Sequence, residues 1–186
     1  DSLVKSFKTK NGRKVSDSRG IEPEIKIEEE YLSVITETLL LKDVIFEFVN
    51  NNIDSYDEDS LNPESFCLSD SAYKSFVNFT CNKKINYQTG SSFQLKELKK
   101  TAKKEKYLKE NEIIFQNLDS IFKVDIVKDL LKNEEEIKFF LENELISRKH
   151  FQRGRMEASL KKDNYVQKAL ELLNNKEEHN KILGYK

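Results

Sequence analysis

From residue 29 onwards, apolar residues recur along the chain at intervals of three and four, the spacing that builds one face of a helix. The clearest run predicts one long amphipathic helix over residues 29–51, ended by the Asn50–Asn52 run. Its apolar stripe consists of Tyr31, Leu32, Ile35, Leu39, Val44, Ile45, Phe48 and Val49. We expect further helices from Ser69-Asp70, over 92–109, within 111–133 and 134–155, and a final one over 163–175. The predicted fold class is therefore mainly α, a helical bundle-like domain preceded by a short β segment.

Residues 1–27 have a different pattern, because apolar residues alternate there rather than recurring every third or fourth position. Asn11-Gly12 favours a tight reversal between two short strands. A two-residue loop would place Phe7 and Val15 on opposite faces, so a longer loop or a bulge fits better. Residues 21–27 alternate apolar and polar and contain Pro23, which predicts an edge strand. Two or three such strands are marginal without more sheet or a covering helix.

We therefore expect two parts in the chain, residues 1–27 and residues 28–186. The first part resembles the edge of a sheet whose other strands are missing, which suggests that a domain precedes it. The sequence begins at Asp1, without an initiator Met and without a signal-peptide pattern. We interpret Asp1 as a position inside a longer protein.

Composition excludes some partners. The chain has 186 residues, of which 37% are hydrophobic, enough for a core of ordinary size. Its 32 Lys and Arg residues nearly balance 33 Asp and Glu residues, for a net charge of -1, which argues against wholesale binding to nucleic acid or to an anionic membrane. The longest apolar run, residues 34–49, is interrupted by charges and is too short to span a bilayer.

The residue types needed for catalysis lack a recognisable arrangement. A nucleophile is normally presented by a Gly-rich turn, and the five glycines are scattered. His150 and His179 lie on polar helices, and both are predicted to be surface side chains. We assign no catalytic residue and no cofactor.

The sequence contains only weak signals of a metal site or a nucleic-acid site. The acidic residues 54–59 lack the alternate spacing and central Gly of an EF-hand loop, so we expect a solvated loop rather than a Ca²⁺ site, and we assign no metal ligand. Cys67 and Cys81 lack metal-ligand spacing, which leaves free thiols or, in an oxidising compartment, a disulfide. The basic stretch from Lys96 to Lys109 includes acids and has no aromatic ladder, which favours a solvated helix face. Asn78 begins an Asn-Phe-Thr triplet, to which we assign no glycan.

Residues 1–27 resemble the closing segment of the protease domain in carboxyl-terminal processing (tail-specific) serine peptidases. In that family an Asn/Ser-Gly-Arg turn is followed by a "GI-x-P-D/E-I" strand. The matching residues are Asn11, Gly12, Arg13, Gly20, Ile21, Pro23, Glu24 and Ile25, with Glu24 where the family usually has Asp. Residues 146–173 are similar to the C-terminal helical extension of the Bacteroidetes-type members. The similar positions there are Phe151, Gly154, Arg155, Asp163, Ala169, Leu172 and Leu173.

This resemblance implies that residues 1–27 are the last strands of a catalytic domain and that residues 28–186 form a C-terminal helical domain. The family's Ser nucleophile and Lys base would lie upstream, so the chain alone would be an inactive part of a serine endopeptidase that acts on polypeptides. The helical domain would pack on the upstream catalytic domain, self-associate as a homo-oligomer, or control substrate access. Its stripe containing Ile35, Leu39 and Phe48 is the candidate contact surface. The resemblance also implies export to the periplasm or envelope, which would favour a disulfide between Cys67 and Cys81.

An alternative hypothesis has no enzymatic parent. In it, the chain is a free-standing helical interaction protein whose opening strands pair with the edge of a partner's sheet. A nucleophile turn encoded upstream of Asp1 would distinguish the two hypotheses.

Overall fold

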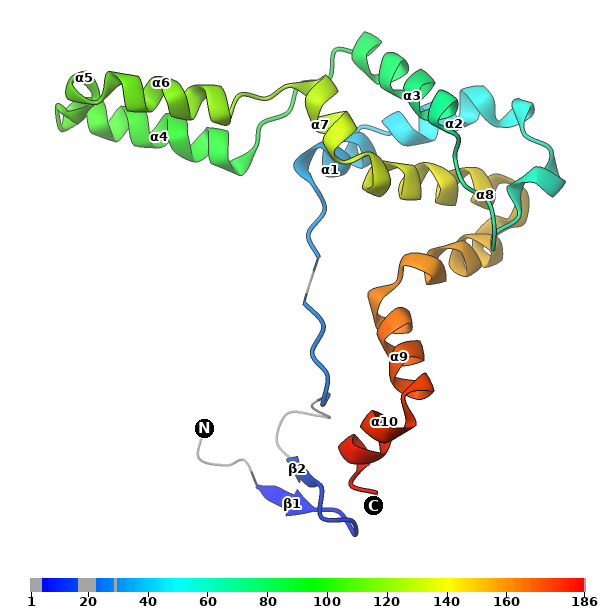
Figure 1. Cartoon of the computed structure of the whole chain (residues 1–186). Helices are drawn as coiled ribbons and strands as arrows, with labels where there is room; N and C mark the ends of the chain where they lie inside the picture. Colours follow the sequence, from blue (N-terminus) through cyan, green and yellow to red (C-terminus); the bar gives the residue numbers. More distant parts are fainter. Residues whose placement is uncertain (1–4, 17–22, 29, 186) are drawn as a thin grey trace. The chain divides into compact units, whose positions relative to one another are not determined.

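A computed structural model describes residues 5–16, 23–28 and 30–185. The chain forms two compact units: Tyr31–Ala158 is one, and Asp1–Glu30 together with Ser159–Lys186 is the other. We call them the helical unit and the terminal unit. The described residues are mainly α-helical and include a short β segment near the N-terminus, which confirms the predicted fold class (Figure 1). The C-terminal residues group with the N-terminal segment, whereas the sequence analysis placed them with the helices from residue 28.

The terminal unit begins with an antiparallel hairpin of β1 (Ser6–Lys8) and β2 (Lys14–Ser16), in which Phe7 lies opposite Val15. Residues 9–13 form the loop, where the Thr9 amide donates to the Arg13 carbonyl at 2.8 Å and the Gly12 amide donates to the Thr9 carbonyl at 2.9 Å. Gly12 has a φ of 83°, a left-handed conformation that Gly adopts without a steric penalty. This register confirms that the loop is longer than two residues and that Phe7 and Val15 share a face.

The predicted edge strand over residues 21–27 is wrong for the part that the structure describes. Residues 23–28 contain a bend at Glu24–Ile25 and belong to no strand, and Ile21 lies outside the described residues. Pro23 has no amide hydrogen for a ladder, and the only strands among the described residues, β1 and β2, pair with each other. The alternation is nevertheless visible in burial, because Ile25 and Ile27 are half-buried between exposed neighbours.

The C-terminal part of the terminal unit is helical. After the 3₁₀ turn η3 (Leu160–Lys162), α9 (Asn164–Asn174) begins where the Asp163 carboxylate accepts from the amides of Tyr165 at 2.8 Å and Val166 at 3.1 Å. This helix ends before Lys176, as predicted. It is not the final helix, however, because α10 (Lys176–Leu183) follows, capped by Asn175.

In the helical unit, the predicted helix over residues 29–51 is divided into α1 (Val34–Leu41) and α2 (Val44–Asn52). Asp43 separates them with a left-handed φ of 55°. At about 100° per residue, an unbroken helix would place Leu39 and Val44 about 140° apart. Both side chains are fully or almost fully buried, so the break rotates α2 until its apolar face meets the same core as α1.

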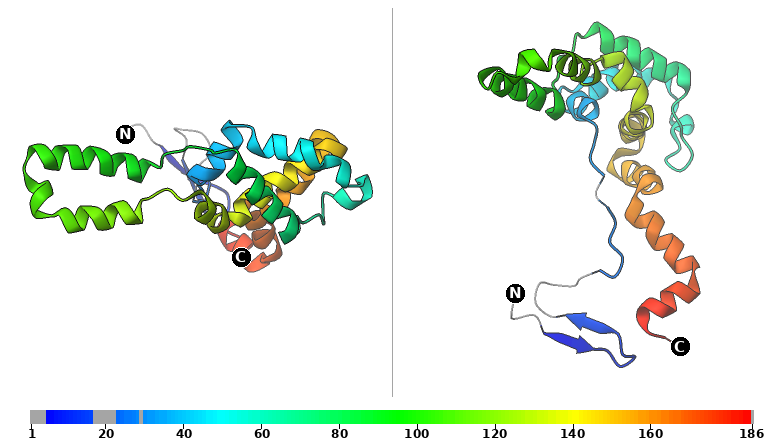
Figure 2. Two further views of the ribbon diagram at one scale, coloured as in Figure 1. Left: turned by 90° about the horizontal axis from the view of Figure 1, so that it is seen from above. Right: turned by 60° about the vertical axis from the view of Figure 1, so that its left-hand side comes forward.

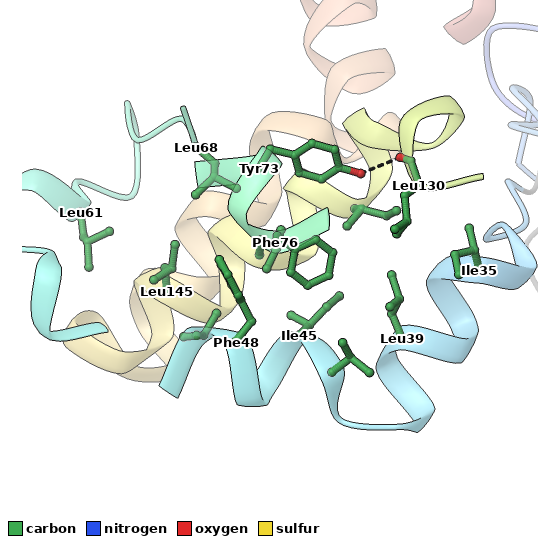
Figure 3. Packing of buried hydrophobic residues seen from close by; sticks show 14 residues of the cluster. Ile35, Leu39, Ile45, Phe48, Leu61, Leu68, Tyr73, Phe76, Leu130 and Leu145 are labelled. Atoms are coloured by element: carbon green, nitrogen blue, oxygen red, sulfur yellow. Dashed lines mark hydrogen bonds between the residues drawn. The ribbon is translucent and has the colours of Figure 1, made fainter. Parts of the chain in front are cut away.

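The remaining helices of this core lie around the long helix α8 (Glu134–Ser159). The short 3₁₀ turns η1 (Ile53–Ser55) and η2 (Glu58–Leu61) are followed by α3 (Asp70–Asn82), which starts at the predicted position. The Ser69 hydroxyl caps it by accepting from the Ala72 amide. The short helix α7 (Ile126–Lys132) precedes α8. Buried side chains from these elements form the core shown in Figure 3. They are Ile35, Leu39, Val44, Ile45, Phe48, Val49, Leu61, Leu68, Tyr73, Phe76, Leu130, Ile137, Leu141 and Leu145.

Polar contacts bind α8 and α7 to the other core elements. The buried Tyr73 hydroxyl donates to the Leu130 carbonyl at 2.6 Å, and burial raises the pKa of this phenol (Figure 3). Glu136 of α8 accepts from the Ser33 hydroxyl at 2.6 Å at the start of α1. Lys138 of α8 lies 2.8 Å from a carboxylate oxygen of Asp70, at the start of α3. The hydrogen bond between them raises the pKa of Lys138 and lowers the pKa of Asp70.

Besides its core, the helical unit contains a helical hairpin, which we call the arm. It consists of α4 (Gly90–Lys104), α5 (Tyr107–Glu110) and α6 (Glu112–Ile121), with α4 and α6 side by side (Figure 2). The predicted helix over residues 92–109 is too long, because Lys106 has a left-handed φ of 71° and turns the chain. At the base, the Tyr87 hydroxyl donates to the Asp129 carboxylate; burial and this contact raise the pKa of Tyr87. No helix among the described residues is long and apolar enough to cross a membrane.

Candidate docking surface of the terminal unit

The described residues of the terminal unit expose large apolar side chains and form no buried core. None of its described residues is buried, in contrast to the helical unit. Its large exposed apolar side chains are Phe7, Leu160, Tyr165, Leu170, Leu173 and Tyr185. Phe7 is 50% exposed and Leu173 is 62% exposed. Because burial of apolar area is the main favourable term in folding, such a unit requires another surface to cover it.

The turn and the proline segment of the sequence motif are brought together in this unit. Arg13 of the hairpin loop forms an ion pair with Glu24, which follows Pro23. The carbonyl of Asn11 lies against Gly184, at the end of α10, where a Cβ atom would come within 3.0 Å of the oxygen. Gly20 and Ile21 of the motif lie outside the described residues. The loop therefore contacts both residue 24 and the end of α10.

A groove runs between the proline segment and α9. It has a volume of about 560 Å³ and is open to solvent. One wall is Ile25–Ile27; the other is formed by Asn164, Gln167, Lys168 and Glu171. Ile25 and Ile27 on one wall, opposite polar side chains of α9, suit an extended polypeptide better than a small charged ligand.

The contribution of α9 to this surface was not predicted from the sequence. Val166, Ala169, Leu170 and Leu173 recur at intervals of three and four, yet none is buried. An apolar stripe on a helix that no other element covers indicates a docking surface, and the spacing of the apolar residues in the sequence already shows this stripe. The similar positions Ala169 and Leu173 belong to it, while Asp163 serves as the helix cap.

The prediction that the stripe containing Ile35, Leu39 and Phe48 is the contact surface for a catalytic domain is wrong. All three side chains are buried in the core of the helical unit, with Leu39 at 0% exposure. The stripe packs against α3, α7 and α8 of the same chain, which the sequence could not reveal because an amphipathic stripe does not name its partner.

The two histidines lie in separate units. His179 is half-buried on α10. His150 is half-buried on α8, and its Nε2 atom is buried without a hydrogen-bond partner, so the prediction of a surface side chain is wrong. His150 packs close to Gly154, where a Cβ atom would lie 2.2 Å from the His150 Cβ. This contact explains its burial by packing.

Other candidate residues lie outside this surface. The acidic residues Asp54, Asp57, Glu58 and Asp59 are exposed, and the described residues contain no group of three His, Cys, Asp or Glu that could hold a metal ion. Cys67 and Cys81 are free thiols. On the arm, Lys99 pairs with Asp119 and Lys100 with Glu97, which fits the predicted solvated helix face.

The fold defines a mainly α-helical domain with a short β segment at its N-terminal end. The chain belongs to the family described as the C-terminal helical domain of a probable PDZ-protease, whose model matches residues 35–173, well over half of the chain. The match extends from α1 through nearly all of α9 and so includes the arm and the whole of α8, which is kinked at Phe151. No curated protein and no solved structure gives a significant match.

Proposed function

We propose that this chain is the C-terminal part of a carboxyl-terminal processing serine peptidase. In this proposal, residues 1–27 are the end of the catalytic domain, with β1 and β2 as its last strands, and an upstream Ser and Lys hydrolyse the peptide bond. Two independent features support it: the protease-associated family that matches residues 35–173, and the turn and proline motif of residues 7–27 outside that match. The peptidase would act on polypeptides in the periplasm or cell envelope.

The structural support for this proposal comes from the terminal unit. Its β1 strand exposes Phe7, its proline segment belongs to no strand, and α9 presents an uncovered apolar stripe. A catalytic domain with an open sheet edge would pair with the strands and cover α9 at the same time. The helical unit, which has its own buried core, would then pack on the catalytic domain, self-associate or control substrate access.

A protease assay tests whether the chain is part of such a peptidase. We expect the chain alone to leave unstructured peptides intact, while the full-length parent cleaves them and loses that activity when its upstream Ser is replaced. In the parent, Phe7→Asp and Leu173→Asp should each weaken activity or stability, since a carboxylate would be buried against an apolar surface. Lys181→Asp, an exposed position on α10, is the matched control and should behave as wild type. Proteolysis by the chain alone would overturn the proposal.

A further inference from the structure

The arm has two unlike broad faces. Leu95 and Ala102 of α4 are buried, and Phe115 and Leu118 of α6 are half-buried, so these positions mark the sides of the two helices that face each other. The ion pair between Lys99 and Asp119 bridges the helices along one edge of this contact. We call the surface on that side the lysine face.

Helix geometry shows on which of the two faces of the arm the other exposed positions lie. At about 100° per residue, Lys96 and Lys103 fall on the lysine face with Lys99. Leu98 of α4 falls on the opposite broad face. On α6, Ile114 and Ile121 are turned away from Asp119 by more than a right angle, which places them on the same side of the hairpin as Leu98.

The face opposite the lysines, which we call the neutral face, is apolar and uncharged. Leu98, Ile114 and Ile121 are 52%, 57% and 68% exposed, respectively. The remaining positions on it within α4 and α6 are uncharged and polar: Ser91, Gln94, Thr101 and Asn117. Glu105, the exposed C-cap residue that follows α4, is the charged residue at the end of this face. Charged residues make up 35% of the chain, so the lack of a charged side chain on this face within α4 and α6 is unusual, and three uncovered aliphatic side chains on it require a partner.

We propose that the neutral face is the interface between two copies of this chain. A partner for an uncharged face must itself be uncharged over the same area, since an unpaired charge buried there would be costly. The neutral face of a second copy meets this requirement. Two hairpins packed face to face form a four-helix bundle with the lysine faces outside. Asn117, between Ile114 and Ile121 on α6, would select the register, as a single buried Asn does in coiled coils.

The expected interface is small. Helices of 15 and 10 residues are about 22 and 15 Å long, and two of them side by side are about 20 Å wide. The face therefore covers roughly 400 Å² on each copy, or about 800 Å² in total, at the lower limit of specific interfaces. A weak, reversible dimer follows, with a dissociation constant on the order of 10 µM or weaker. This dimer does not depend on a peptidase parent.

Sedimentation velocity of the chain over a range from about 1 µM to 1 mM tests the proposal, spanning the weak affinity expected for so small an interface. We expect the mass to rise with concentration from that of the 21.9 kDa monomer to twice that value. The double variant Leu98→Asp, Ile121→Asp should remain monomeric at every concentration with unchanged helical circular dichroism, because both side chains are exposed in the monomer. Lys103→Asp on the lysine face is the matched control and should dimerise as wild type does.

Two further variants separate this interface from other faces. Leu173→Asp, in the terminal unit, should leave the dimer intact, so that association through that unit's exposed apolar surface is distinguishable. Asn117→Cys, with Cys67 and Cys81 replaced by Ser, should form a disulfide between copies, whereas Lys103→Cys in the same background should not. A monomeric wild type at 1 mM, or a dimer that survives the double Asp substitution, would overturn the proposal.

Discussion

At the scale of single residues, Phe151 and Gly154 determine the shape of α8. Phe151 interrupts the helix with a φ of 55° and a ψ of -156°, a conformation that costs a non-Gly residue about 1–3 kcal/mol. Gly154 follows one turn later, where its missing side chain leaves room for His150. Both belong to the positions that resemble the peptidase extension, and the structure gives them a physical role in the kink.

Replacement of Gly154 by Ala tests that role. A new Cβ would lie 2.2 Å from the Cβ of His150, so the kink must open or the helix must shift. We expect a loss of about 1–3 kcal/mol in the free energy of unfolding, measured by urea denaturation. Gly90→Ala is the control, because nothing lies within 4 Å of its Cβ position, and it should be neutral or stabilising by up to about 1 kcal/mol. Equal effects of the two substitutions would contradict the packing explanation.

At the scale of elements, the break between α1 and α2 shows how packing overrides a helical pattern. The apolar spacing through residues 29–51 is continuous enough to predict one helix, and local propensity contains no Pro or Gly to end it. The core requires Leu39 and Val44 to point inward together, which an unbroken helix forbids. Asp43 accepts the left-handed conformation that solves this conflict, as Asp and Asn do more readily than other residues.

The changes in stability caused by substitutions at Asp43 should therefore depend on the backbone preference of the new residue rather than on its charge. Asp43→Gly should stabilise the helical unit by about 0.5–1 kcal/mol, since Gly adopts a positive φ without strain. Asp43→Val should destabilise it by about 1 kcal/mol or more, because a β-branched residue resists that φ. Asp43→Asn removes only the charge and should be nearly neutral. Thermal unfolding of the three variants gives the order, and a neutral Val variant would show that the break is not strained.

At the scale of the whole molecule, the two units differ in what holds them together. The helical unit has a contiguous buried core, whereas the described residues of the terminal unit have none. Local stability follows the number of buried apolar contacts, so the two units should open independently.

Hydrogen exchange by mass spectrometry measures this difference. In the chain alone, the amides of α9 and α10 should exchange much faster than those of α8 before its kink, because no buried side chains protect them. In the full-length parent, the same amides should become protected. Protection of α9 in the chain alone equal to that of α8 would show that the terminal unit is stable without a partner.

Much of the fold could be predicted from residue patterns. The start of α3 at Ser69, the end of α9 before Lys176 and the long hairpin loop all follow from caps, spacing and turn chemistry, which act within a few residues. The surface assignments could not be predicted in this way. Ile35 and Leu173 have the same helical spacing, yet one is buried in the core and the other is exposed.

The sequence by itself determined the helical class, the short β segment and the motif that resembles a peptidase, because periodicity, caps and turn residues are local properties. Only the tertiary structure decided which apolar stripe forms the core, that residues 159–186 group with the N-terminal segment, and that the arm has a neutral face. The physical reason is that an amphipathic helix specifies only that one side must be covered. What covers it depends on contacts between residues that are far apart in the chain.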